Sequence, residues 1–181
     1  MVYLFLAQGF EETEAVAPVD LLRRAGAGVK TVGIGGQHIT GVNGIEVTAD
    51  IADTQISVDD MEMVVLPGGV PGTNNLENSP IVRASIQYCV QNGKKVAAIC
   101  AAPSILGHMG LLSGHSAVCY PGYEKELSGA KIASEPVCVS GNFITARGAG
   151  VAIPFGLKLV EVLFDKQKAN EIKKQVQCEK H

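Results

Sequence analysis

An excess of positive charge is missing from this chain of 181 residues. Fifteen Lys and Arg residues against 18 Asp and Glu residues give a formal net charge of -3. The basic residues are scattered apart from a small group around Lys173 and Lys174, so no basic surface is predicted that would attract a polyanion. The composition therefore argues against nucleic acid as a partner.

A long apolar run is also missing. The apolar stretch at residues 2–6 is much shorter than the roughly 20 residues that a helix needs to cross a bilayer. No positively charged segment of a secretory signal precedes it. We therefore expect no membrane partner and a cytoplasmic, reducing compartment, in which cysteines remain free thiols.

Metal and nucleotide motifs are missing as well. The cysteines have no C-x-x-C spacing and the histidines no H-x-x-x-H spacing, so a structural metal site is not supported. The glycine-rich loops of nucleotide-binding proteins are not found either. We expect no metal and no cofactor. The residues concerned are Cys89, Cys100, Cys119, Cys138 and Cys178, and His38, His108, His115 and His181.

What the sequence does contain is an alternation of short apolar runs with longer helical segments. A chain that is 46% hydrophobic and 18% charged can bury a sizeable core, and its length suits one domain over residues 1–181. Continuous apolar runs are typical of strands covered on both faces of a parallel sheet. Strands are predicted at residues 2–6, 29–34, 63–66, 96–99 and 143–146.

Helices are predicted over residues 12–24, 80–91, 101–109, 151–164 and 166–177, with proline and glycine at several of their ends. Alternating apolar residues between 35 and 50 predict a hairpin appended to one edge of the sheet. The expected architecture is a three-layer α/β sandwich that binds ligands beyond the carboxyl ends of its strands.

Residues 95–104 contain the strongest functional signal. A predicted strand ends at Cys100, with Ala98 and Ala102 two positions before and after it. This pattern is typical of a nucleophile elbow, a tight turn that presents a reactive side chain. The following helix would lower the pKa of the thiol, and the N–H of Ala101 would face an oxyanion. The spacing alone leaves open that Cys100 is a small apolar residue of the core.

Two other segments end at the same predicted edge of the sheet. Gly68 and Gly69 follow the third strand, where glycine lets the backbone approach a ligand and the Gly69 N–H could be a second oxyanion donor. An ordinary turn is the alternative. Glu14 lies in the first turn of a helix. The helix dipole explains Glu11 and Glu12 as surface residues, whereas a Glu14 buried beside Cys100 would have a raised pKa suited to proton transfer.

Five motifs in order resemble the ThiJ/PfpI superfamily, in the branch that includes the parkinsonism-associated deglycase. They are Glu11-Glu12-Thr13-Glu14-Ala15-Val16, Asp20-Leu21-Leu22-Arg23-Arg24-Ala25-Gly26, Val64-Val65-Leu66-Pro67-Gly68-Gly69, Ala97-Ala98-Ile99-Cys100-Ala101-Ala102-Pro103 and Thr145-Ala146-Arg147-Gly148. Together they span nearly the whole chain.

The resemblance implies a flavodoxin-like fold and a homodimer. It also implies that Cys100 is a reactive, easily oxidised thiol, and that Glu14 is a protonated carboxyl hydrogen-bonded to it. Gly69 and Ala101 would supply the oxyanion N–H groups. Arg23, Arg24 and Arg147 match arginines near the family's dimer interface or site.

The chain also departs from the family pattern. Tyr120 stands where some members carry a histidine before a proline, and Ala101 stands where protease-like relatives carry a histidine after the cysteine. Both differences disfavour peptidase activity. Ala146 replaces the usual serine before Arg147, which removes a hydroxyl from the expected site.

Two functions are compatible with these residues. The first is a cofactor-independent glyoxalase or deglycase that acts on small 2-oxoaldehydes such as methylglyoxal, with Cys100 as nucleophile and Glu14 as proton carrier. The alternative is an oxidative-stress sensor or chaperone that works through oxidation of Cys100. Both use the same thiol, so the sequence does not separate them.

Overall fold

The first strand, β1 (Val2–Leu6), is covered on both faces. In the computed structural model, which describes residues 1–178, Val2, Leu4 and Leu6 contact one apolar cluster. Tyr3 and Phe5 contact a second cluster, and all five side chains are at most 2% exposed. Successive side chains of a strand point to opposite faces, so this uninterrupted apolar run produces a central strand with helices on both sides.

The central sheet has seven strands in the order β10-β11-β7-β6-β1-β2-β5. All neighbouring pairs are parallel except β10 and β11. The bounds are β1 (Val2–Leu6), β2 (Val29–Gly33), β5 (Ile51–Ala52), β6 (Met63–Leu66), β7 (Lys95–Ile99), β10 (Val137–Ser140) and β11 (Phe143–Ala146). The five predicted strands are confirmed to within one residue. β5 and β10 were not predicted, because edge strands that are short and only partly buried lack a continuous apolar run.

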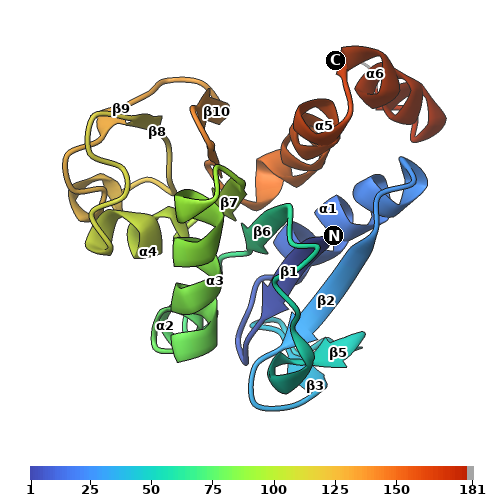
Figure 1. Ribbon diagram of the computed structural model, residues 1–181. Helices are drawn as coiled ribbons and strands as arrows, with labels where there is room; N and C mark the ends of the chain where they lie inside the picture. The colour runs from blue at the N-terminus through green and yellow to red at the C-terminus, as the bar shows by residue number, and fades with distance from the viewer. Residues whose placement is uncertain (179–181) are drawn as a thin grey trace.

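Helices cover the two faces of the sheet and make three layers (Figure 1). One face packs against α1 (Glu12–Arg24) and α5 (Ala152–Leu163), with α6 (Lys166–Gln175) packed on α5, and the other face packs against α2 (Gly72–Glu77), α3 (Pro80–Gln91) and α4 (Pro103–His108). The predicted three-layer α/β sandwich is confirmed. α4 is shorter than predicted, because the residues from Cys100 to Ala102 form a turn and Pro103 suits the first turn of a helix.

The predicted hairpin is present but not at the edge of the sheet. β3 (His38–Thr40) and β4 (Glu46–Thr48) pair antiparallel as a separate two-stranded sheet. The Thr40 carbonyl accepts a hydrogen bond of 2.8 Å from the Gly9 N–H, and the N–H of Val42 donates to the Phe10 carbonyl at 2.8 Å. The hairpin is therefore held against the loop between β1 and α1, and β5 forms the edge instead.

A second small sheet lies beside the β10 edge of the central sheet. It pairs β8 (Ser116–Ala117) with β9 (Lys131–Ile132). The segment after β8 runs towards β7: Val118 N–H donates to Thr145 Oγ1 at 3.0 Å, and Tyr120 N–H donates to the Cys100 carbonyl at 2.8 Å. Short 3-10 turns are η1 (Asp53–Gln55), η2 (Glu124–Glu126) and η3 (Ala149–Val151).

The carboxyl ends of β1, β6, β7 and β11 meet at one edge of the molecule. β1 lies between β2 and β6, so the strand order reverses direction beside β1, where open α/β sheets place their ligand sites. Within residues 1–178 no helix is long and apolar enough to span a bilayer. The same residues include no group of three or more His, Cys, Asp or Glu side chains that could hold a metal ion.

Candidate active site

Cys100 occupies a tight turn directly after β7. Its φ of 66° lies in the left-handed region that residues other than glycine seldom adopt. The turn is held because the Cys100 N–H donates to the Ala146 carbonyl at 2.9 Å. Ala98 and Ala102 are fully buried on either side. The backbone geometry is that of the predicted elbow, and the thiol is half-buried rather than enclosed in the core.

Glu14 is fully buried in the first turn of α1. Its N–H donates to the Glu11 side chain at 2.8 Å, which caps the helix, and its Oε2 accepts the Gly68 N–H at 2.9 Å. Among the described residues, Oε1 has no hydrogen-bond partner. Burial raises the pKa of Glu14 to about 7, and contact with the Cys100 thiol and the Gly68 N–H opposes that rise.

Gly68 makes the contact between Glu14 and Cys100 possible. A Cβ on Gly68 would lie 2.6 Å from Cys100 Cβ and 2.7 Å from Glu14 Oε2. Gly69 has a φ of +92°, and a Cβ there would lie 2.6 Å from the Gly9 carbonyl. The loop after β6 therefore approaches the thiol only with glycine at both positions, and the N–H groups of Gly69 and Ala101 lie beside the sulfur.

The thiol and the carboxyl share one site, so their ionisation is coupled. Burial raises the pKa of Cys100 to about 12, with the negative charge of Glu14 as the next cause, while the N–H groups of Ala101 and Gly69 act in the other direction. A thiolate and a carboxylate therefore do not coexist here near neutral pH. The thiolate forms when Glu14 holds the proton.

The expected lowering of the Cys100 pKa by the following helix was wrong. α4 begins at Pro103, three residues beyond the thiol, and it is only six residues long. The dipole effect falls off within the first turn, so it does not outweigh burial. The donors that favour a thiolate are the two backbone N–H groups and a protonated Glu14.

Tyr120 lies at the mouth of the site. Its side chain is 51% exposed, and the Cys100 carbonyl accepts its N–H. Gly148 lies between Tyr120 and Glu14: a Cβ on Gly148 would be 3.3 Å from Tyr120 Cδ2 and 3.8 Å from Glu14 Oε1. Gly148 follows β11 in the quoted motif, but the sequence interpretation did not single it out, since an isolated glycine after a strand resembles any loop glycine.

The three arginines named from the sequence do not meet at the thiol. Arg23 pairs with Asp50 at 2.5 Å and Arg24 pairs with Asp20 at 2.7 Å. Arg23 lies about 14 Å along α1 from Glu14, at roughly 1.5 Å per residue. Arg147 follows β11 and donates to the Ser134 carbonyl. Their expected place near a dimer interface stays a prediction.

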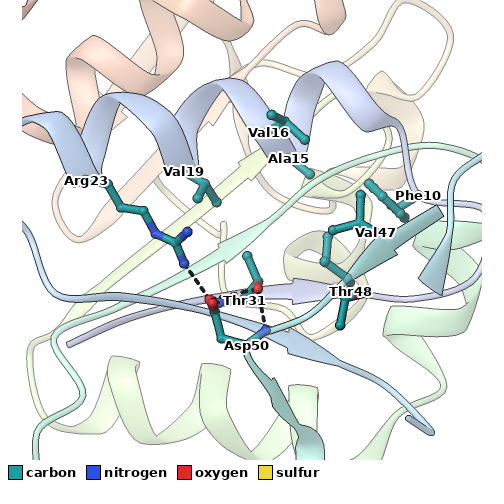
Figure 2. Close-up of a pocket in the computed structure, with 10 residues that line it drawn as sticks. Phe10, Ala15, Val16, Val19, Arg23, Thr31, Val47, Thr48 and Asp50 are labelled. Atoms are coloured by element: carbon teal, nitrogen blue, oxygen red, sulfur yellow. Dashed lines mark hydrogen bonds and ion pairs between the residues drawn. The ribbon is translucent and has the colours of Figure 1, made fainter. Parts of the chain in front are cut away.

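A cavity of about 200 Å³ lies along α1 away from the thiol (Figure 2). Arg23 enters it and bonds Asp50, which also accepts the N–H and hydroxyl of Thr31. The remaining lining is mostly apolar, with Val16 and Val19 on α1 facing Val47 of β4. This cavity has no nucleophile and is separate from the candidate site.

Glu12 corrects the surface interpretation of the acidic first turn. Its side chain is only 6% exposed, and its carboxylate accepts hydrogen bonds from the N–H of Asn43 at 2.8 Å, from Asn43 Nδ2 at 2.9 Å and from the N–H of Ile45 at 3.3 Å. Glu12 therefore holds the hairpin turn onto α1. Sequence reasoning missed this role because the partner lies about thirty residues away.

No histidine among the described residues contacts the thiol. His108 lies between Glu77 at 2.7 Å and Glu126 at 2.9 Å. His115 packs edge-on against Phe143, and His38 pairs with Glu46. His181 lies outside the described residues. This arrangement leaves Glu14 as the acid-base group of the candidate site.

Comparison with known proteins identifies the family. The sequence profile of the DJ-1/PfpI family matches residues 1–162. The chain belongs to this family. Among relatives, "Protein dj-1beta" of Drosophila melanogaster is 36% identical over 174 residues, which cover 94% of this chain and 93% of that protein. The predicted family resemblance is confirmed.

Two other similar proteins are a solved structure and a relative that is named as an enzyme. The structure described as "Toxoplasma gondii DJ-1, oxidized" superposes with a TM-score of 0.93 and 35% sequence identity, covering 97% of each chain. This match confirms the flavodoxin-like fold. A Caenorhabditis elegans relative, "Glutathione-independent glyoxalase DJR-1.2", is 29% identical over 165 residues, 91% of this chain and 88% of that protein.

Proposed function

We propose that this protein is a cofactor-independent glyoxalase or deglycase that acts on small 2-oxoaldehydes such as methylglyoxal. The observation that carries the proposal is the contact of one thiol, one buried carboxyl and two backbone N–H groups at a single sheet edge. The name of the Caenorhabditis elegans relative supports the same reaction. No specific contact favours the sensor or chaperone role over the enzyme.

Cys100 is the proposed nucleophile. The Glu14 carboxylate takes the thiol proton, which creates the thiolate without adding a second negative charge to the buried site. The sulfur then attacks the aldehyde carbon, C1, and the carbonyl electron pair moves to oxygen. The N–H groups of Gly69 and Ala101 lie beside the sulfur, where they can stabilise the developing oxyanion.

Glu14 is the proposed proton carrier for the following steps. Its proton passes to the oxyanion, which completes the hemithioacetal and restores the carboxylate. The carboxylate then removes the C1 proton and returns it to the neighbouring carbon, C2, while the hydroxyl proton passes from the C1 oxygen to the C2 oxygen, so C1 is oxidised and C2 is reduced within one molecule. Water hydrolyses the resulting thioester to a 2-hydroxy acid and the free thiol. A pKa near 7 suits a group that both accepts and donates a proton.

The deciding experiment is conversion of methylglyoxal to lactate with no added glutathione or metal. We expect lactate from the unmodified protein, none from Cys100→Ser and a fall of at least about a hundredfold in Glu14→Gln, since general acid-base catalysis typically contributes roughly 10²–10⁴-fold. Undetectable lactate from the unmodified protein with a reduced Cys100 would refute the proposal. Release of free amine from a glycated peptide is followed in parallel, and only release faster than the spontaneous dissociation of the adduct would indicate direct deglycation.

We also propose that the protein forms a homodimer through α1 and the hairpin. Val16 on α1 and Val42 and Ile45 in the hairpin turn are 52%, 46% and 58% exposed. Glu12 hydrogen-bonds the turn and lies one helical turn before Val16, so these side chains belong to one surface. Burial of this surface against a second copy would remove apolar area from water.

A further inference from the structure

Three hydrogen bonds join Glu11, Gly68 and Glu14 in a closed ring. The Glu14 N–H donates to Glu11 Oε2 at 2.8 Å, the Glu11 N–H donates to the Gly68 carbonyl at 2.9 Å, and the Gly68 N–H donates to Glu14 Oε2 at 2.9 Å. Each residue donates once and accepts once. Glu11 is therefore connected to Glu14 directly through its side chain and, through Gly68, to the Glu14 carboxyl.

The backbone of Glu11 is packed tightly against the loop that follows β6. A Cβ on Gly69 would lie 2.6 Å from the Glu11 nitrogen, so the loop reaches this position only with glycine. The same loop supplies the Gly69 N–H beside the Cys100 sulfur. The position of Glu11 is thereby tied to the groups that surround the thiol.

Helix capping alone does not explain a glutamate at position 11. Glu11 is the N-cap of α1, and its side chain accepts the N–H of Glu14, the third residue of the helix. Serine, threonine, asparagine and aspartate are the preferred N-cap residues, so a neutral serine hydroxyl would satisfy the same N–H. What the Glu11 carboxylate adds is a negative charge next to the buried Glu14.

The groups that face Glu14 act on its pKa in opposite directions. Burial raises that pKa most, and the negative charge of Glu11 also raises it, whereas the Gly68 N–H, the Cys100 thiol and the Ala149 N–H of η3 lower it. Among these neighbours in the described part of the chain, Glu11 and Cys100 are the titratable ones. Glu11 thus supplies a charge that does not depend on the state of the thiol.

We propose that Glu11 is a positioning residue for the proton transfers of the proposed reaction: its side chain holds the first turn of α1 against Gly68 and the thiol, and its negative charge determines the pH range in which Glu14 exchanges a proton. Glu11 acts through Glu14 and not on the substrate. The inference rests on the proposed function for the identity of the reaction, whereas the action of Glu11 on Glu14 can be measured without turnover.

The first test compares variants that all keep a capping oxygen. Glu11→Asp keeps the charge, whereas Glu11→Ser and Glu11→Gln remove it. In protein labelled with ¹³C at the glutamate carboxyl carbon, the chemical shift of Glu14 against pH gives the pH at which this residue is half-ionised, and Glu14→Gln assigns the signal.

The expected result follows from the loss of a like charge, which favours ionisation. The pH of half-ionisation should fall in Glu11→Ser and Glu11→Gln by at least about 0.3, a twofold change in the ionisation constant. It should be retained in Glu11→Asp. Urea unfolding of Glu11→Ser and Glu11→Asp should give similar stabilities, since both residues are good N-caps.

The second test measures kcat/KM for methylglyoxal against pH. Glu14 begins the proposed reaction as a carboxylate with a pKa of about 7, so activity should fall below that pH. Because Glu14 ionises at lower pH in Glu11→Ser, the ratio of kcat/KM in this variant to that of the unmodified protein should be roughly twofold higher at pH 6 than at pH 8. For Glu11→Asp the same ratio should not change with pH, and a role in capping alone predicts no change in either variant.

The outcomes separate the role of Glu11 from the proposed function. Turnover together with an unchanged pH of half-ionisation in Glu11→Ser and Glu11→Gln would overturn the role of Glu11 and leave the glyoxalase proposal standing. No turnover by the unmodified protein, together with a lower pH of half-ionisation in these variants, would support the action of Glu11 on Glu14 and overturn the glyoxalase proposal. Turnover with a kcat/KM ratio for Glu11→Ser that is the same at pH 6 and pH 8 would overturn the role of Glu11 in the reaction.

Discussion

At the scale of single residues, the candidate site depends on how closely Cys100 and Glu14 approach each other. Both are buried enough for desolvation to be the first cause of their raised pKa values. Each charge also disfavours the other. The pair therefore functions with one proton and one negative charge, and the position of that proton determines whether the sulfur is nucleophilic.

The first prediction concerns the proton between them. The charge of Glu14 raises the pKa of Cys100, so Glu14→Gln, which removes the charge and keeps a hydrogen-bond donor, should lower that pKa. Glu14→Leu removes the charge and also the donor, so the pKa of Cys100 should fall less than in Glu14→Gln. The rate of iodoacetamide alkylation against pH measures both. An unchanged Cys100 pKa in Glu14→Gln would contradict the coupling of the two groups.

The second prediction concerns Gly68. In Gly68→Ala the new methyl group would meet Cys100 Cβ at 2.6 Å and Glu14 Oε2 at 2.7 Å, so the two groups must separate. We expect loss of lactate formation and a destabilisation of roughly 1–3 kcal/mol from overpacking. Gly150→Ala is the control, since no atom lies within 4 Å of its Cβ position. Equal activity in the two variants would contradict the described contact.

At the scale of elements, the site is built from loops that distant segments hold in place. Glu12 ties the hairpin turn to α1, and His108 on α4 joins Glu77 of α2 to Glu126 of η2. These links secure the two sides of the edge where the thiol lies. Each can be broken without touching the thiol.

The third prediction breaks the hairpin link. Burial opposes ionisation of Glu12, but the hydrogen bonds it accepts hold its pKa below its usual range. Glu12→Ala leaves the N–H groups of Asn43 and Ile45 without this acceptor and should cost about 1–3 kcal/mol in urea unfolding. Glu12→Gln keeps an amide oxygen and should cost less. Similar losses for both variants would show that the acceptor role is not what stabilises the turn.

The fourth prediction concerns pH and His108. Hydrogen bonds that the His108 ring donates to the carboxylates of Glu126 and Glu77 raise the pKa of His108 in the folded state. Its contribution to stability is therefore fully present below the unfolded value of about 6.5 and is lost as pH rises through the folded value. The difference in Tm between the unmodified protein and His108→Gln should be larger at pH 6 than at pH 9. A difference that grows with pH would contradict the ion pairs.

At the scale of the whole molecule, the elements with long apolar patterns were predictable and the long-range partners were not. The runs that form β1 and β6 are buried on both faces, so their periodicity and their place in a parallel sheet follow from residue type. The elbow was also predictable, because a tight turn leaves space only for small side chains on either side, and Ala98 and Ala102 are small.

What the sequence did not show depends on contacts across the fold. Three kinds of contact connect segments that lie far apart in the chain. They are the hydrogen bonds of buried Glu12, those that hold the hairpin against the loop after β1, and the proximity of Tyr120 to Gly148. The pKa of Cys100 was misjudged because burial and the Glu14 charge are properties of the folded site, whereas the helix start after Cys100 is visible in the sequence.

The fifth prediction belongs to the assembly. If α1 and the hairpin form a homodimer interface, Val16→Asp should place a charge in the buried apolar surface and shift sedimentation from dimer to monomer. Val139→Asp is the matched control, since Val139 is 45% exposed on the edge strand β10. A monomer in the unmodified protein, or a dimer unaffected by Val16→Asp, would refute this interface.

The roles of Cys100 as nucleophile and of Glu14 as proton carrier are tested most directly by measuring the mass of the protein after brief reaction with methylglyoxal. In Glu14→Gln the thiol can still add to the aldehyde, but the proton cannot move from C1 to C2. We expect that rapid acid quenching, which slows the breakdown of a hemithioacetal, leaves an adduct of one substrate mass on this variant and none on Cys100→Ser. Lactate production by Cys100→Ser at the rate of the unmodified protein would contradict it.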